Sequence, residues 1–384
     1  MYDLIIKNGR LFDPGSGLDR LADLAVSDGV IAETGDLGDA TANSMVDAAG
    51  CYVTPGLTDY HAHIFFGGSE FSTPADIMAL PNGVVRVVDG GTAGCAGFEA
   101  LYRNCMVNSC VEVKAMLNLC TIGQPSHFYL EDQDPKLVNV REIRRLCEKY
   151  KGAIVAIKLR QSKFIVGDND LEPLRTAVMV AEQVGLRVVV HASDSPGEIR
   201  ETLDLLRPGD VFCHVYHQRG QTILGEDGKV RPELFAARER GILFDMAHGS
   251  MQFSGKVARA AIEQGFLPDI VSSDLSALSH CKAPTYSFSY VMAELLNLGM
   301  DFGDIVTACT TAPSRLLGAP NRDFLVKEKP ANLAVLRLVE RPVSYVDKYG
   351  NRYAGDRLIK PEITIVNGQI LFRQYDNFNV MTSQ

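Results

Sequence analysis

Residues Tyr52–Gly68 read Tyr-Val-Thr-Pro-Gly-Leu-Thr-Asp-Tyr-His-Ala-His-Ile-Phe-Phe-Gly-Gly, and the fold prediction rests on the pattern in this stretch. Pro55 and Gly56 interrupt the chain, a short apolar run follows, and His61 and His63 come at its end. In an extended strand, residues i and i+2 point to the same face, so both imidazoles can reach one cation. An isolated His-x-His pair is equally consistent with two ordinary core or surface histidines. The Pro-Gly entry and the Gly-rich exit favour the carboxyl end of a barrel strand, where barrel enzymes keep their active sites.

The length and composition of the chain fit a large core with a smaller accessory domain. The chain has 384 residues, of which 46% are hydrophobic and 22% are charged, and a barrel takes about 250 residues. The net charge of −9 argues against a nucleic acid or an anionic membrane as a partner, because no basic face is available for phosphate. The first residues show neither a basic leader nor a long apolar core, and the nine cysteines include no Cys-x-x-Cys pair. We therefore expect a cytoplasmic protein with reduced thiols.

The middle of the chain alternates apolar runs with amphipathic stretches. Eight apolar runs predict strands at Gly56–Tyr60, Val84–Val88, Val113–Leu117, Ala153–Ile157, Arg187–Val190, Val211–Cys213, Gly241–Phe244 and Asp269–Val271. Amphipathic stretches predict helices at Arg141–Tyr150, Leu171–Val184, Glu198–Leu206, Pro232–Arg240, Lys256–Gln264 and Phe288–Asn297. Eight such units predict an α/β fold with a (β/α)8 TIM-like barrel, and a doubly wound open sheet is the alternative.

Both ends of the chain predict short strands joined by tight turns. Asn-Gly and Asp-Gly pairs favour positive φ and close hairpins, and they occur at Asn8–Gly9, Asp28–Gly29 and Asn367–Gly368. Each end is short for a core of its own, and the two ends together bury more surface. We therefore predict that residues 1–54 and 320–384 form one small β-sandwich domain, with the barrel, residues 55–319, inserted between them.

Ionisable or metal-competent side chains follow five of the eight predicted strands. They are His61 and His63 after the first strand, Lys158 after the fourth, His191 after the fifth, His214 after the sixth and Asp274 after the eighth. Each has an ordinary explanation by itself: a loop histidine, a lysine that reaches solvent, or a helix N-cap aspartate. Closing the barrel brings all these strand ends to one cavity, so their joint occurrence predicts a metal site.

These residues together resemble the amidohydrolase superfamily, specifically its binuclear zinc members. The resemblance rests on Pro55–Gly56, Asp59-x-His61-x-His63, Lys158, His191, His214 and Asp274, and it extends over the whole chain. Three segments, Val88–Gly94, Ile157–Arg160 and Phe244–Gly249, are most similar to the dihydroorotase-like deacetylase group.

The resemblance implies two zinc ions, although other divalent metals would also suit such ligands. It places one zinc on His61, His63 and Asp274, the other on His191 and His214, and a carboxylated Lys158 between them. An ammonium group would repel two dications, whereas a carbamate formed with CO2 has two anionic oxygens that can span metals about 3.5–4 Å apart. In the implied mechanism a zinc-bridging hydroxide attacks a carbonyl, and Asp274 is the catalytic residue that passes the proton to the leaving group.

Two further residues are predicted to bind the substrate. Arg160 follows Lys158 by two positions and therefore faces the same side, where it can clamp a carboxylate; a structural salt bridge is nearly as good an explanation. His248 lies four residues past the seventh strand and either contacts the substrate or caps a loop. Strand alternation predicts that Cys213 faces away from the cavity.

The resulting functional hypothesis is a metal-dependent amidohydrolase. We expect it to cleave an amide or ester bond, as a deacetylase does, in a small carboxylate-bearing substrate. Ring opening of a cyclic amide or ureide is the alternative, but Ile64, Phe65 and Phe66 stand where dihydroorotases have a carboxylate-binding Arg. A catalytically silent scaffold is the weakest hypothesis, because all six metal-ligand positions are filled. Barrels of this shape often associate, which leaves a homo-oligomer open.

Overall fold

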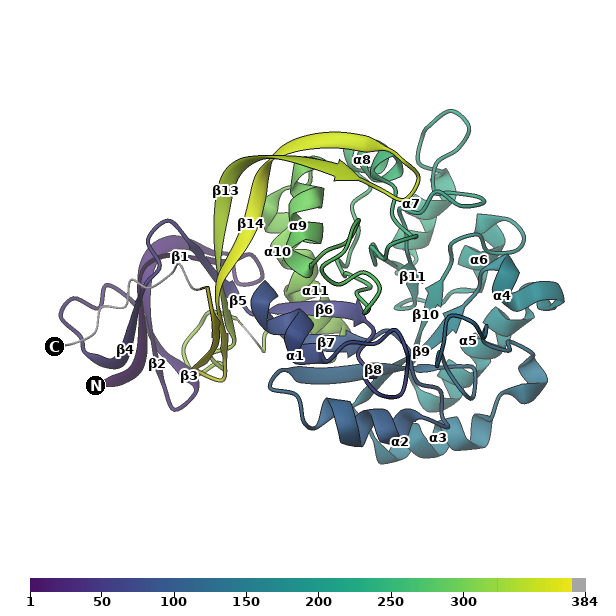
Figure 1. Cartoon of the computed structure of the whole chain (residues 1–384), viewed down its shortest axis with the longest axis horizontal. Helices are drawn as coiled ribbons and strands as arrows, with labels where there is room; N and C mark the ends of the chain where they lie inside the picture. The colour runs from purple at the N-terminus through teal and green to yellow at the C-terminus, as the bar shows by residue number, and fades with distance from the viewer. Residues whose placement is uncertain (323, 375–384) are drawn as a thin grey trace.

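The computed structural model describes residues 1–322 and 324–374, and it contains two sheets (Figure 1). Its strands are β1 (Tyr2–Asp13), β2 (Leu18–Ser27), β3 (Val30–Gly35), β4 (Ala42–Asp47), β5 (Tyr52–Pro55), β6 (Leu57–Ala62), β7 (Val84–Asp89), β8 (Glu112–Asn118), β9 (Ile154–Arg160), β10 (Arg187–His191), β11 (Val211–Cys213), β12 (Leu243–Asp245), β13 (Leu333–Val346), β14 (Arg352–Val366) and β15 (Gln369–Arg373). Its α-helices are α1 (Ala75–Ala79), α2 (Phe98–Leu101), α3 (Val140–Lys149), α4 (Lys163–Val166), α5 (Glu172–Val184), α6 (Ile199–Leu205), α7 (Pro232–Glu239), α8 (Gly255–Glu263), α9 (Phe288–Asn297), α10 (Phe302–Cys309) and α11 (Thr311–Leu316). Four short turns of other helix types are η1 (Leu80–Asn82), η2 (Tyr102–Met106), η3 (Pro135–Leu137) and η4 (Gly167–Asn169).

The second sheet is the wall of the barrel. Strands β6 to β12 lie side by side in chain order, and every neighbouring pair is parallel. The carboxyl ends of all seven strands therefore lie at one rim. This confirms the predicted α/β fold with a TIM-like barrel, and each of the first seven predicted strands overlaps an observed one.

The eighth predicted strand, Asp269–Val271, is not a regular strand. Single bridges join Ile270 to Asp245 and Leu275 to Ala62, so this segment still connects β12 to β6. His63 N donates to Leu275 O at 2.8 Å, which closes the wall on that side. The ladder is interrupted at Val271, whose N–H donates to Ala308 O at 3.2 Å instead of to a neighbouring strand, and Asp274 further on has a φ of +50°, in the left-handed region.

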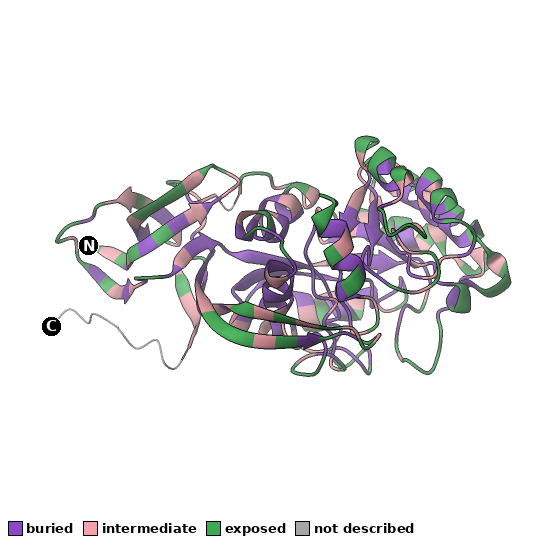
Figure 2. Ribbon diagram, turned by 90° about the horizontal axis from the view of Figure 1, so that it is seen from above, coloured by how far each residue is buried: buried purple, intermediate pink, exposed green. Residues whose placement is uncertain are grey.

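Apolar side chains fill both faces of the barrel wall. An inner cluster lies inside the wall, and a larger outer cluster packs the wall against the surrounding helices. Figure 2 shows the strands as buried, whereas the outer faces of the surrounding helices are exposed. The amphipathic stretches form helices because the apolar face of each helix packs against the barrel wall and excludes water from it, while the polar face meets solvent.

The first sheet combines strands from both ends of the chain. Its order is β15-β14-β13-β5-β1-β2-β3, with β4 paired to β1. One apolar cluster joins Leu4 and Ile31 from the start of the chain to Val335 and Ile363 near its end. Asp28–Gly29 and Asn367–Gly368 form hairpin turns with positive φ, as predicted.

The predicted turn at Asn8–Gly9 is wrong. Strand β1 runs through this pair with a shift of register, and Asn8 has a φ of +61°. The left-handed preference of an Asn-Gly pair is satisfied here by a β-bulge rather than by a hairpin.

Strands β13 and β14 form a hairpin, called here the long hairpin (residues 333–366), that leaves the first sheet and extends over the barrel (Figure 1). The apolar pattern of the sequence predicts strands only at Ala331–Val335 and Glu362–Val366, which cover the first and last few residues of this hairpin. Its outer part is largely exposed and carries many charges, so the apolar pattern that marks a strand is missing there.

The proposed division at residues 54/55 and 319/320 stays a prediction, and Asp323 and residues 375–384 lie outside the described residues. Within the described chain, no helix has the length and apolar character needed to cross a membrane.

Candidate active site

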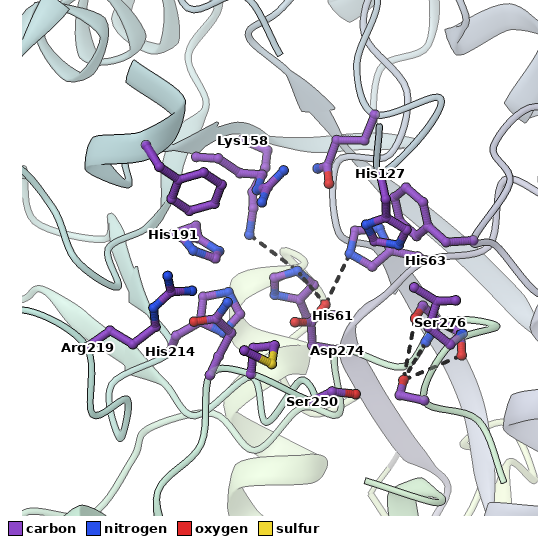
Figure 3. A pocket seen from close by; sticks show the side chains of 18 residues that line it. His61, His63, His127, Lys158, His191, His214, Arg219, Ser250, Asp274 and Ser276 are labelled. Carbon is purple, nitrogen blue, oxygen red and sulfur yellow. Dashed lines mark hydrogen bonds and ion pairs between the residues drawn. The ribbon is translucent and has the colours of Figure 1, made fainter. Parts of the chain in front are cut away.

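The six predicted metal ligands lie together at the rim of the barrel. They line one cavity of about 260 Å³, and Figure 3 shows their side chains converging on it. Two groups among the described residues could hold a metal ion: His61, His63 and Asp274, and His61, Cys213 and His214. Side chains more than two hundred positions apart therefore share one cavity, as strand ends in a barrel should.

The first group surrounds the carboxylate of Asp274. Its Oδ1 lies 3.1 Å from His63 Nε2 and 3.6 Å from His61 Nε2. Burial by itself would raise the pKa of Asp274, but His61 and His63 outweigh it and hold the pKa below its ordinary value of 3.8. The carboxylate is therefore the ionised form, which accepts hydrogen bonds or binds a metal but donates nothing.

The far nitrogen of His63 fixes which nitrogen faces Asp274. Thr92 Oγ1 donates its proton to Asp89 Oδ2 at 2.9 Å, so it accepts from His63 Nδ1, which lies 2.7 Å away. In the neutral imidazole, His63 Nε2 then keeps a lone pair directed at the cavity.

The same argument applies to two other histidines. His214 Nδ1 lies 2.6 Å from the carbonyl oxygen of Ala247, which can only accept. His61 Nδ1 lies 3.2 Å from Cys213 Sγ, whose own proton goes to Asp245 Oδ2 at 3.4 Å. In both imidazoles, Nδ1 carries the proton and Nε2 keeps a lone pair.

Burial keeps these imidazoles neutral. It is the main cause that lowers the pKa of His61, His191 and His214 below the usual 6.5. His191 is held by Ser193 Oγ, 2.7 Å from its Nε2, and its ring centre lies 4.3 Å from that of His214. Neutral, oriented imidazoles are the form that binds a metal.

These protonation states leave acceptors facing each other. His63 Nε2 has a lone pair and Asp274 Oδ1 is anionic, yet the two atoms are 3.1 Å apart. With His63 neutral, such a pair is repulsive, and either a proton on Nε2 or a metal ion between the two atoms makes it attractive. Two ligand atoms on one tetrahedral zinc, with bonds of about 2.0–2.1 Å, lie about 3.3 Å apart. The spacing and chemistry of the donors therefore fit a bound metal.

Lys158 is buried among these ligands with little to balance its charge. Its Nζ lies 3.3 Å from His61 Nε2 and 4.0 Å from Cys213 Sγ, and no carboxylate within the described chain forms an ion pair with it. An unpaired buried ammonium group is costly. Figure 3 shows the amine pointing into the cavity toward His61.

Two glycines after β7 make room for this arrangement. A Cβ on Gly90 would collide with the His61 ring, and a Cβ on Gly91 would meet Lys158 Cβ at 2.5 Å. Gly91 also has a φ of +85°, which glycine adopts at no steric cost. The backbone therefore passes directly against the two central side chains.

The predicted direction of Cys213 is wrong. Its thiol points into the barrel, toward His61 and Asp245. Strand alternation would send His214 to the opposite side, but His214 has a φ of +65°, which turns its side chain to the same rim.

The two predicted substrate residues differ in position. Arg160 lines the cavity, and its guanidinium also pairs with the buried Glu131 at 2.7 Å. The structure does not bring His248 to the cavity, because its ring nitrogens contact Glu294 at 2.8 Å and Thr285 at 3.2 Å. The substrate contacts of both residues stay predictions.

Several lining residues were missed by sequence reasoning. Phe71, His127, Phe164 and Arg219 all line the cavity. They lie in loops, or in one short helix, that carry no periodic pattern, so no sequence signal distinguished them from surface residues.

The chain is similar to known hydrolases and related enzymes. A deacetylase of Brucella anthropi is 30% identical over 364 residues, which cover 92% of this chain and 88% of that relative. A solved structure described as a dihydroorotase has a TM-score of 0.89 at 28% identity, covering 97% of this chain and 99% of the other. Another, described as an adenine deaminase, has a TM-score of 0.89 at 25% identity and covers 97% and 100%. No family model matches the chain.

Proposed function

The chain belongs to the amidohydrolase superfamily, and from this premise we propose that it hydrolyses an acyl bond, amide or ester, of a small carboxylate-bearing molecule. One observation carries the proposal: His63 Nε2 and Asp274 Oδ1, both acceptors, face each other at 3.1 Å. This spacing is also that of two ligand atoms on one tetrahedral zinc ion.

We propose that the cations are two zinc ions. His61, His63 and Asp274 would hold one, and His191 and His214 the other. Lys158 would join them as a carbamate, which turns an unbalanced buried ammonium group into an anionic ligand. Thr92, Cys213, Ser193 and the carbonyl of Ala247 support this by fixing the orientation of the four imidazoles.

When bound, the metals polarise the carbonyl of the substrate and lower the pKa of a water molecule from 15.7 towards about 7. Asp274 then has a role of its own. Its Oδ1 lies 3.1 Å from His63 Nε2 and 3.6 Å from His61 Nε2, and the carboxylate lines the cavity. From there it can take a proton from the attacking water and give it to the leaving nitrogen or oxygen.

Ring opening of a cyclic amide or ureide is the second candidate, because a structure described as a dihydroorotase matches 97% of this chain at a TM-score of 0.89. The residues after the His-x-His pair favour the acyl hydrolase. Ile64, Phe65 and Phe66 are apolar, and none of them can grip a carboxylate.

A substrate panel distinguishes the candidates. The zinc-loaded protein is assayed with N-acetyl amino acids and O-acetyl hydroxy acids, and in parallel with dihydroorotate and hydantoins. We expect turnover of the linear acetylated acids. Turnover of the cyclic compounds alone would favour the second candidate. No turnover together with less than one zinc per chain would support a silent scaffold. The cytoplasmic location and any homo-oligomeric state stay predictions.

A further inference from the structure

Four side chains that line the cavity carry a formal charge: Lys158, Arg160, Arg219 and Asp274. Lys158 and Asp274 belong to the candidate metal site. Arg160 is paired with Glu131, whose side chain is 1% exposed. Arg219 forms no ion pair with any described residue. Outside the candidate metal site, Arg219 is therefore the one cavity-lining cation of the described chain whose charge is not already balanced.

Arg219 is placed to meet a ligand beside the candidate metal site. It follows β11 in the loop that also carries His214, and Figure 3 shows it next to His191 and His214. Its guanidinium lies 5.6 Å from the centre of the Phe164 ring, which also lines the cavity. A cation–π contact does not use the N–H groups of the guanidinium, which remain for another partner.

The backbone that carries Arg219 is held in place on both sides. Arg219 N donates to His217 Nδ1 at 3.2 Å. Gln218 N donates to Tyr349 OH at 3.3 Å, and Gln218 Oε1 accepts from Asn351 Nδ2 at 3.1 Å. Tyr349 and Asn351 belong to the connection of the long hairpin. The hairpin thus pre-organises the loop that presents Arg219.

The opposite side of the cavity carries a group of aromatic rings. Phe71 packs against His63 and His127, with ring centres 5.1 and 4.4 Å apart. In Figure 3, His63 and His127 lie on the other side of the cavity from Arg219. A substrate with an anion at one end and an apolar group at the other would match this division.

We propose that Arg219 binds the carboxylate of the substrate, with the apolar part of the substrate directed to Phe71. This inference rests on the proposed function only for the identity of the reacting bond. The choice of Arg219 over Arg160 does not depend on it. Arg160 is the weaker candidate because it would have to give up or share its bond to the buried Glu131.

The test uses two unreactive probes that differ only in charge. 4-Oxopentanoate resembles an N-acetyl amino acid with a methylene group in place of the amide nitrogen, and 4-oxopentanamide is its neutral counterpart. Their binding to the zinc-loaded full chain is measured by calorimetry for the natural protein and for Arg219→Gln, Arg219→Lys and Arg160→Gln. Zinc content and thermal unfolding show whether each variant is folded and loaded.

We expect the natural protein to bind the acid at least tenfold more tightly than the amide. Arg219→Gln should bring this ratio close to one, Arg219→Lys should restore part of it, and Arg160→Gln should keep most of it, because charge-assisted pairing is lost only with Arg219. The inference is overturned if Arg219→Gln keeps the ratio, if Arg160→Gln alone abolishes it, or if the natural protein binds neither probe at millimolar concentration. Because the probes are not hydrolysed, an Arg219-dependent ratio without turnover of any acetylated acid would reject the proposed reaction alone.

Discussion

Hydrogen bonds on the far side of each imidazole control what the histidines can bind. The Thr92 hydroxyl accepts from His63 Nδ1 and donates to Asp89, which leaves Nε2 free for a metal. We predict that Thr92→Val lowers zinc affinity about 10- to 100-fold, because a valine of the same shape cannot hold this orientation. Competition with a chelator measures the affinity.

The control for this variant is Thr121→Val, whose hydroxyl bonds, among the described residues, only to the carbonyl of Leu137. It should leave zinc affinity unchanged. Equal affinities of the natural protein and Thr92→Val would mean that His63 needs no support from Thr92.

The carboxylate of Asp274 is expected to move the proton in the reaction. We predict that Asp274→Asn lowers kcat by roughly 10²- to 10⁴-fold, since an amide of the same shape cannot accept the proton. Substantial zinc should remain, because His61, His63, His191 and His214 are unchanged. Steady-state kinetics and metal analysis are the measurements. An unchanged rate would remove Asp274 from the mechanism.

The sequence could predict which side chains meet, but not how they are held. Strand-end positions brought His61, Lys158 and His191 to one rim, because parallel strands of a barrel end together. The direction of Cys213 could not be predicted, since the φ of +65° at His214 breaks the alternation. Arg219 carries no pattern at all, because a single loop arginine resembles any surface residue.

The long hairpin connects the first sheet to the loops of the cavity. Tyr349 OH accepts from Gln218 N and donates to Met251 O at 2.9 Å, and Met251 lines the cavity. We predict that Tyr349→Phe lowers kcat/KM for a carboxylate substrate about 3- to 10-fold, since each lost hydrogen bond is worth about 1 kcal/mol. Zinc content should not change.

A second tyrosine of the same hairpin supplies the matched control. Tyr345 OH accepts from Asn297 in α9, away from the cavity loops. Tyr345→Phe should therefore lower thermal stability without changing the preference for the acid over the amide. Equal kinetic effects of the two variants would show that the hairpin supports the fold and not the site.

Elements with a clear apolar period were predicted well, and elements without one were not. Helix α9 matches its prediction at both ends, Phe288–Asn297, because one face of the helix is continuously apolar. The eighth barrel segment failed as a strand because Val271 N–H bonds to Ala308 O rather than to a neighbouring strand, which leaves only single bridges. The outer half of the long hairpin failed because most of its side chains are exposed or only partly buried, so no apolar alternation marks it as strand.

The stability of the barrel depends on a cluster of charges away from the active site. Burial by itself would raise the pKa of Glu112, but Arg86, Arg322 and Lys114 outweigh it and lower the pKa from 4.5 to about 2. Glu112 lies 2.9 Å from Arg86, which is 1% exposed. A pKa that is lower in the folded state adds stability above pH 4.5, and this stability is lost as the pH falls towards 2.

We predict that Glu112→Gln lowers the free energy of unfolding by about 2 kcal/mol at neutral pH, a value reduced to allow for solvent screening of a partly exposed carboxylate. The difference from the natural protein should shrink as the pH falls from 4.5 to 2. Denaturant unfolding across this range is the measurement. Asp204→Asn, in an exposed pair with Arg200, is the control and should have little effect. If the difference in unfolding free energy between Glu112→Gln and the natural protein does not depend on pH, the ionised Glu112 carboxylate is not its source.

The fold as a whole followed from the order of the predicted elements. Alternating strands and helices predict a parallel sheet, and the strands β5 and β13 that join the two chain ends lie side by side, with Val53 opposite Val335. What could not be predicted is how the long hairpin reaches the barrel. Its contacts to Gln218 and Ser254 are polar and involve single residues, so no periodic pattern indicates them.

The central claim is that His61, His63, His191, His214 and Asp274 hold two metal ions joined by a modified Lys158. The most direct test is a crystal structure of the zinc-loaded protein with anomalous diffraction data at the zinc edge. We predict two anomalous peaks about 3.5–4 Å apart between these side chains, and carbamate density on Lys158 Nζ. No peak among the histidines, or a Lys158 that remains an unmodified amine beside bound metal, would contradict the claim.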